Sequence, residues 1–274
     1  MKFAPRFSLV AVVVCCGLAG PAWTADQDCA PLRALPGYQA AGDGPRRRAY
    51  DEAEFTMQRD DGTQTAGIAG AFCAQRYVPE RSQSPMSDAD IQSAYREQLE
   101  KDGAQVLYAD EHSTDARWIN NGRDLWIKVA SHGGAIEVTV VARGSLSQVL
   151  TAPAGSDYPL LGHMPNYEAG TPHRSGSGAL AFETQAGGKV EKVEVHGKEY
   201  AVAYHLKPSA MPNSDLDIQM NYRNALKELG AKILFIDARD TVAQLQRDGR
   251  PTWIKVSSQE TSIEVEVIEA PTSP

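Results

Sequence analysis

The chain has 274 residues, of which 42% are hydrophobic and 23% charged, and its formal net charge at pH 7 is −8. This acidic balance, without a clustered basic run, disfavours nucleic acid and anionic membrane surfaces as partners. We therefore expect no nucleic-acid-binding function.

The first 25 residues have the order of a secretory signal peptide. Lys2 and Arg6 precede an apolar run from Phe7 to Gly20, and small residues up to Ala25 offer a cleavage region. The run is too short to span a bilayer, and no later apolar run reaches about 18 residues, so no transmembrane segment is expected in the mature chain. Lipidation at Cys16 is the alternative, disfavoured by a second cysteine directly before it. Export predicts a periplasmic location, with outer-membrane association or secretion as alternatives.

Two of the four cysteines belong to this predicted signal, which leaves Cys29 and Cys73. Two thiols in an exported protein predict one disulfide, with two buried free thiols as the alternative. Closing a loop of about 45 residues would contribute about 4 kcal/mol in the chain-entropy model.

The remainder of the chain repeats itself. Trp126 to Val129 reads WIKV, and the same letters return 127 residues later at Trp253 to Val256. The same offset aligns Tyr95-Arg96 with Tyr222-Arg223. Such self-similarity predicts a tandem duplication of a unit of ordinary domain size. The predicted organisation is a signal peptide at 1–25, a first repeat at 26–144, a linker at 145–156, a second repeat at 157–270 and a tail at 271–274.

The first third of each repeat is predicted to consist of strands. The first repeat has strand signals at 55–57 and 71–78, and the second at 190–195 and 200–206. Asp60-Asp61-Gly62 and Gly187-Gly188-Lys189 are typical turn sequences between them.

One main helix follows in each repeat. Ser87 and Ser214 begin acidic first turns, in which a serine side chain accepts from backbone N–H groups. Apolar residues then recur at helical spacing, and Gly103 and Gly230 are expected to end the helices. Buried strands are predicted at 106–108 and 233–235, and a short second helix at Thr241 to Arg247.

Each WIKV run is predicted to pair with the alternating strand that follows it. The expected cross-strand pairs are Val129–Ile136, Lys128–Glu137 and, in the second repeat, Lys255–Glu264. Lysine opposite glutamate helps to fix the register. The tryptophans are expected to cover the outer face of the sheet or the seam between the repeats. The fold class is therefore α+β with mostly antiparallel pairing, and the two copies are expected to pack as a pseudo-dimer.

Four stretches of the second repeat resemble a known family. They are Asp157–Leu161 (DYPLL), Met164–Tyr167 (MPNY), Gly197–Tyr200 (GKEY) and Asn221–Phe235. Together they are similar to the N-terminal module of some OmpA-like proteins of bacterial cell envelopes and to related stand-alone envelope proteins of unknown function. The resemblance implies a periplasmic or outer-membrane-associated protein. It does not extend to the C-terminal peptidoglycan-binding domain of that family, so cell-wall anchoring is not expected.

The sequence contains no nucleotide-binding loop, Ser-His-Asp signature or zincin motif. We therefore predict no catalytic residues and no cofactor. Four histidines of the second repeat have no histidine at the matching position of the first, and imidazole is a common metal ligand. These candidate metal ligands are His163, His173, His196 and His205, with scattered surface histidines as the alternative.

Repeated residues give a second set of candidates. Arg96 and Arg223 follow a core tyrosine on each helix and could face a ligand at the seam, together with Trp126 and Trp253. The alternative is a packing role for the tryptophans and a solvated edge for the arginines.

The leading functional hypothesis is a non-catalytic envelope module that binds another envelope protein or an outer-membrane component. The alternative is a small-molecule or metal binder with its site between the repeats. A hydrolase is the least favoured hypothesis, because the sequence does not show a nucleophile with a general base to activate it.

Overall fold

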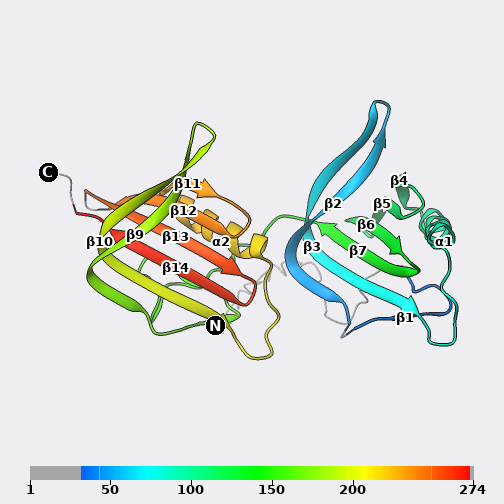
Figure 1. The fold of residues 1–274 in the computed structure, drawn as a ribbon, viewed down its shortest axis with the longest axis horizontal. Coiled ribbons are helices and arrows are strands. Elements are labelled where there is room, and N and C mark those ends of the chain that lie inside the picture. The colour runs from blue at the N-terminus through cyan, green and yellow to red at the C-terminus, as the bar shows by residue number, and fades with distance from the viewer. Residues whose placement is uncertain (1–31, 43, 248, 272–274) are drawn as a thin grey trace, which may run out of the picture.

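The computed structural model describes residues 32–42, 44–247 and 249–271. It contains two antiparallel seven-stranded sheets and two α-helices, so the fold is α+β (Figure 1). The predicted signal peptide, Cys29 and the last three residues lie outside the described residues. Cys73 is fully buried and interacts with the rest of the chain, and its pairing with Cys29 stays a prediction.

The first sheet and its helix are built from residues 38–143. Their order in space is β1-β3-β7-β6-β5-β4, and β2 pairs with the same edge of β3 as β1 does, opposite β7. The elements are β1 (Tyr38–Ala40), β2 (Arg46–Arg59), β3 (Gly62–Pro79), α1 (Asp88–Lys101), β4 (Gln105–Ala109), β5 (Ser113–Asn120), β6 (Arg123–His132) and β7 (Ala135–Arg143).

The second sheet has the same arrangement, element for element. Its order is β11-β12-β13-β14-β10-β8, with β9 pairing with β10. The elements are β8 (Tyr167–Ala169), β9 (His173–Ala186), β10 (Lys189–Leu206), α2 (Asp215–Glu228), β11 (Lys232–Ile236), β12 (Asp240–Arg247), β13 (Arg250–Gln259) and β14 (Ser262–Glu269). We call residues 32–143 the first unit and residues 157–271 the second unit.

Both helices begin and end where the sequence predicts. Ser87 and Ser214 are the N-caps, and their side chains accept from the backbone N–H groups of Asp90 and Asp217. Gly103 and Gly230 follow the last turns with φ angles of 83° and 78°, a conformation that glycine adopts without steric cost. Neither helix, at 14 residues, is long enough to cross a membrane.

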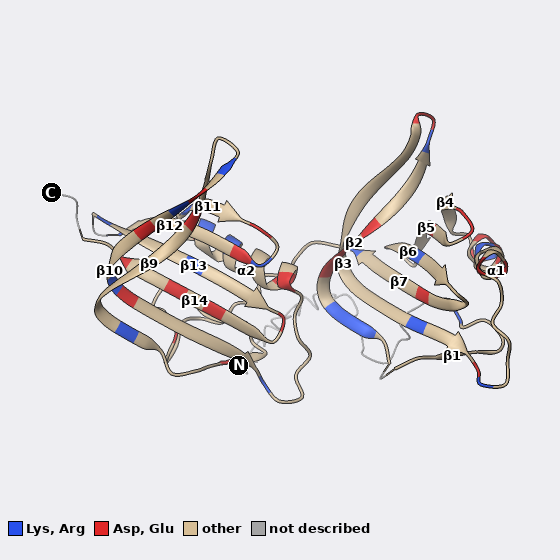
Figure 2. Cartoon of the chain, in the orientation of Figure 1, with Lys and Arg blue, Asp and Glu red and all other residues tan. Residues whose placement is uncertain are grey.

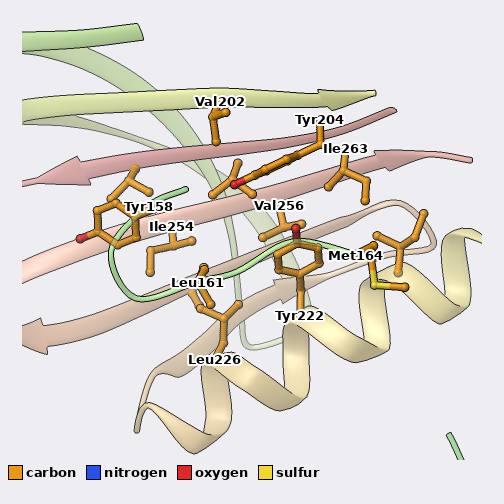
Figure 3. Close-up of a cluster of buried hydrophobic side chains, with 14 of the residues drawn as sticks. Tyr158, Leu161, Met164, Val202, Tyr204, Tyr222, Leu226, Ile254, Val256 and Ile263 are labelled. Carbon is orange, nitrogen blue, oxygen red and sulfur yellow. The ribbon is translucent and has the colours of Figure 1, made fainter. Parts of the chain in front are cut away.

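Each helix packs on one face of its sheet and forms the main core there. In the second unit Tyr222 of α2 points toward the sheet, where the side chain of Tyr204 of β10 lies above it, with Leu226 and Val256 in the same cluster (Figure 3). Met164 enters the same core from the loop before β8. This cluster holds the second helix and the second sheet together.

The opposite face of each sheet is covered by its long hairpin. Phe55 of β2 meets Trp126 of β6 with ring centroids 5.6 Å apart, and Phe182 of β9 meets Trp253 of β13 at 5.4 Å. These contacts form smaller apolar clusters on the outer faces. The tryptophans of WIKV therefore cover the outer face of the sheet, one of the two places predicted for them, and the hairpin tips extend beyond it (Figure 1).

The predicted hairpin register is wrong by two residues. Val129 pairs with Val138, Lys128 with Thr139 and Lys255 with Glu266. A two-residue Gly133-Gly134 turn, with φ angles of 57° and 77°, places His132 opposite Ala135. Such a turn matches the twist of the strands, so it sets the register in place of the Lys128–Glu137 pair. Because the shift is two residues, the buried faces are unchanged.

Two further predictions of local structure are corrected. Thr241 to Arg247 is strand β12 and not a helix, because β12 lies inside the sheet, where its residues Thr241, Val242 and Ala243 are buried. The two strands predicted at 190–195 and 200–206 are one strand, β10, with an irregularity between Gly197 and Glu199.

Candidate functional site

The four candidate metal-binding histidines each have separate surroundings. His163 Nδ1 lies 3.0 Å from Asp157 Oδ1, and its ring stacks on Tyr204. His196 and His205 are both exposed on β10 and stand nine residues, or about 30 Å, apart along it. His173 Nε2 lies 3.8 Å from Glu199. No three His, Cys, Asp or Glu side chains gather as metal ligands in the part of the chain that the structure describes.

The candidate arginines and tryptophans also stay within their own units. Arg223 donates from Nε to Thr241 Oγ1 at 2.8 Å and from Nη2 to the Asp237 carbonyl at 2.6 Å. It therefore ties α2 to the β11–β12 connection. Arg96 is half-buried on α1, and the two tryptophans lie under the hairpins as described above.

The seam between the two units is joined by polar contacts. The buried Arg48 of β2 donates from Nη2 to Glu260 Oε2 of the second unit at 2.7 Å. Ser214 Oγ, besides capping α2, donates to the carbonyl of Tyr50 at 2.5 Å. Figure 2 shows a basic stretch at the start of β2, on the side of the first sheet that faces the second unit.

The segment between β7 and β8 also contacts the second helix. The backbone N–H of Val149 donates to Asn221 Oδ1 at 2.8 Å, and the side chain of Gln148 donates to the Asn221 carbonyl at 3.0 Å. Asn221 thus holds this segment against α2.

A cavity of about 280 Å³ lies where β2, this connecting segment and the start of α2 meet. Its polar lining includes Tyr50, Asn166, Asn213 and Asp217, and its apolar lining includes Leu146, Val149 and Pro165. The cavity therefore receives residues from both units, a common position for a ligand site.

Asp217 is the acidic group of this cavity and is only 3% exposed. Its carboxylate accepts from Asn213 Nδ2 at 2.6 Å and from Asn221 Nδ2 at 2.8 Å. Burial raises the pKa of Asp217, and the two asparagine donors oppose that rise. Asn213 Oδ1 is buried and accepts no hydrogen bond from the described residues. The site thus offers a desolvated carboxylate and an unused amide oxygen.

The corresponding position of the first unit is different. Asp90 occupies the same place in α1, but it is exposed, and among the described residues its carboxylate accepts from Ser87 alone, at 2.6 Å and within its own turn. At the 127-residue offset, Met86 stands for Asn213 and Ala94 for Asn221. The sequence alone explains both aspartates as helix-capping acids, so it missed the buried one. The asparagines without a counterpart were the signal that could have found it.

The chemistry of the cavity favours a ligand that donates hydrogen bonds. A carboxylate and an amide oxygen attract N–H donors, above all a positively charged ammonium group, while leucine, valine and proline accept an apolar body. Among the cavity's lining residues, none pairs a nucleophile with a histidine base, as acyl-transfer chemistry would require.

A scan of protein-family models finds no match to this chain, and a search among curated proteins finds no match either.

Proposed function

We propose that this protein is a non-catalytic binding protein of the bacterial cell envelope that holds a small organic ammonium ligand between the two repeats of a duplicated unit. In this proposal the protein is exported to the periplasm, as its predicted signal peptide and its resemblance to OmpA-like envelope proteins both imply. Binding of another envelope protein or an outer-membrane component stays a further prediction.

The duplication is supported by strand registers that recur at the 127-residue offset. Ala71 pairs with Ala142 as Lys198 pairs with Glu269, and Leu125 pairs with Ala142 as Thr252 pairs with Glu269. Equal pairing of every strand except β1 and β8, whose registers differ by two residues, is expected of two copies of one ancestral unit. The two copies then form a pseudo-dimer with its seam at Arg48, Glu260 and Ser214.

The ligand class rests on one observation, the contrast between Asp217 and Asp90. An acid at the same helix position is solvated in one unit and buried in the other, where two asparagines orient it beside a cavity. Burying a carboxylate without a cationic partner is unfavourable, so a cation that enters the cavity gains a strong partner. We infer that Asp217 is the anchor for an ammonium group.

The proposal is tested by thermal unfolding of the whole chain with putrescine or choline, and with 1,4-butanediol and butyrate as uncharged and anionic probes. We expect putrescine or choline to raise the melting temperature of the wild type and of the Asp90→Asn control. At a ligand concentration of 100 times Kd, the gain is about 2.7 kcal/mol. Asp217→Asn should remove the effect, because the carboxylate is lost.

The Asp90→Asn control separates a loss of ligand binding from a general loss of stability. Both Asp90→Asn and Asp217→Asn neutralise an acid at the same position of a helix, but only Asp217 lines the cavity. No shift for the wild type with either ammonium probe would contradict the proposed ligand class. An equal shift for Asp217→Asn would show that the cation binds elsewhere.

A further inference from the structure

One end of the second sheet carries a row of basic side chains beyond the edge of the main core. Arg174 of β9 stands opposite Tyr200 of β10, Lys198 stands opposite Glu269, and Glu269 stands opposite Thr252. Arg250 of β13 is opposite Arg247 of β12. Residues opposite one another, or two apart on a strand, share a face of the sheet. Tyr200 and Val267 belong to the core under α2, so this row lies on the helix-bearing face.

Three hollows along this row share some of their lining residues. One of about 360 Å³ is lined by Tyr158, Arg174, Lys198 and Glu269 among others. A second, of about 300 Å³, shares Lys198 and Glu269 with it and is also lined by Arg250. The third, of about 430 Å³, lies between Arg247, Arg250, Thr252 and Glu269. The three hollows adjoin at Glu269, which borders each of them, and together we call them the basic groove.

Two tyrosines form the floor of the basic groove. Tyr158 and Tyr200 are buried, with ring centroids 5.5 Å apart, and the guanidinium of Arg174 lies 5.4 Å from the Tyr200 ring centroid. Tyr158 donates to Glu269 Oε1 at 3.2 Å, and Tyr200 donates to the carbonyl of Ser156. The floor is therefore fixed by packing and hydrogen bonds, while the basic side chains around it are exposed.

The charge balance of the basic groove is positive, although the chain as a whole is negative. Arg174, Lys198 and Arg250 outnumber the carboxylate of the row, that of Glu269, and Arg247 takes part in a further interaction of its own. Glu199 borders the groove as well, but it alternates to the other face of β10, where it faces His173 at 3.8 Å. An excess of positive charge in a hollow attracts anions.

The first unit lacks this groove at the matching positions. Ala71, Cys73, Leu125 and Ala142 replace Lys198, Tyr200, Thr252 and Glu269 at the 127-residue offset, and Asn120 replaces Arg247. Only Arg47 and Arg123 keep the basic character of Arg174 and Arg250. Sheet packing at this end does not require the charges of Lys198 and Glu269, since alanine stands at both matching positions of the first unit.

We propose that the basic groove of the second unit binds a small oxyanion, a phosphate- or carboxylate-bearing ligand. Guanidinium groups present paired N–H donors that match the oxygens of phosphate and carboxylate, and Lys198 adds a point charge between them. The apolar lining beside them, which includes Pro159 and Val267, accepts the apolar part of such a ligand. The groove is lined by none of the residues of the seam cavity, so this inference is independent of the proposed ammonium site.

The test is calorimetric titration of the whole chain with inorganic pyrophosphate at low ionic strength and again at about 0.15 M salt. We expect the wild type to bind, and to bind more weakly at the higher salt. Lys198→Ala and Arg250→Ala should each weaken binding about tenfold or more, as the loss of a charge-assisted hydrogen bond predicts. Both side chains are exposed, so the fold should survive.

Two controls match the change in charge. Arg123→Ala removes the arginine at the position equivalent to Arg250, and Lys189→Ala removes a lysine at the β9–β10 turn; both should bind pyrophosphate as the wild type does. Vesicles of phosphatidylglycerol, compared with phosphatidylcholine, identify a lipid phosphate as the source if their binding is lost in Lys198→Ala. Absence of binding to pyrophosphate and to both vesicles, or equal losses in the controls, would overturn the proposal. Asp217→Asn should leave pyrophosphate binding intact, which separates this site from the seam.

Discussion

Single residues distinguish the two units more than their folds do, and Asp115 is the clearest case in the first unit. Its side chain is fully buried beneath β2, where the N–H of Thr56 donates to Oδ2 at 3.3 Å and Lys128 Nζ lies 3.7 Å from Oδ1. Burial, only partly offset by Lys128, raises its pKa to about 6. Val242 fills the equivalent buried position of the second unit. An acid in place of valine therefore costs the first unit stability at neutral pH.

This acid gives a pH-dependent prediction. A carboxyl group whose folded pKa lies near 6, above the unfolded value of 3.8, binds protons more tightly in the folded state. Stability is therefore lost as the pH rises from about 4 to about 6, by about 3 kcal/mol in total. Urea unfolding of Asp115→Asn at several pH values should lack this loss. Asp115→Val, which copies the second unit, should behave in the same way. A wild-type slope retained in both variants would contradict the assignment.

The seam shows why a site can escape a sequence-based prediction. Asp90 and Asp217 follow their capping serines in similar sequences, and local rules predict the same exposed helix start for both. Only the position of β2 against α2 buries one of them. The residues that mark the difference, Asn213 and Asn221, are ordinary polar residues until the cavity brings them to the carboxylate. Local chemistry was predictable here, and the tertiary surroundings were not.

At the scale of elements, the ends of the helices were easier to predict than the register of the paired strands. The helix caps and the glycines after the last turns follow from backbone geometry that acts within a few residues. The strand register depends on turn geometry, and here a Gly133-Gly134 turn outweighed a charge pair worth a few tenths of a kcal/mol. The sequence pattern of the segment that begins at Thr241 is compatible with a helix and with a strand, because short apolar runs occur in both. Only its pairing with the neighbouring strands β11 and β13 decides between them.

The two helix caps give a prediction in which each is the control for the other. Ser87→Ala removes an exposed cap and should lower the free energy of unfolding by about 1 kcal/mol. Ser214 is 2% exposed and also donates across the seam to Tyr50. Ser214→Ala should therefore cost about 2 kcal/mol or more, since it loses a cap and a buried hydrogen bond. Equal losses in urea unfolding would show that the contact with Tyr50 contributes nothing to stability.

At the scale of the molecule, the apolar cores stay separate. Each of the four buried apolar clusters contains residues of one unit only. The contacts between units that we have described are hydrogen bonds and one ion pair, and polar pairs of this kind are typical of interfaces that permit relative motion. Repetition in the sequence predicted the strand-rich content of both units. It could not predict the seam, because the residues that build it differ between the copies.

Separate cores joined by a polar seam should unfold in more than one step. In differential scanning calorimetry we expect a calorimetric enthalpy about twice the van't Hoff enthalpy, as two cooperative blocks require. Asp115→Asn should move only the transition of the first unit, and Ser214→Ala chiefly that of the second. An ammonium ligand at Asp217 contacts both units, so it should bring the two transitions closer together and raise the van't Hoff enthalpy. A single transition with equal enthalpies in the absence of ligand would show instead that the few seam contacts, Arg48 with Glu260 among them, suffice to couple the units.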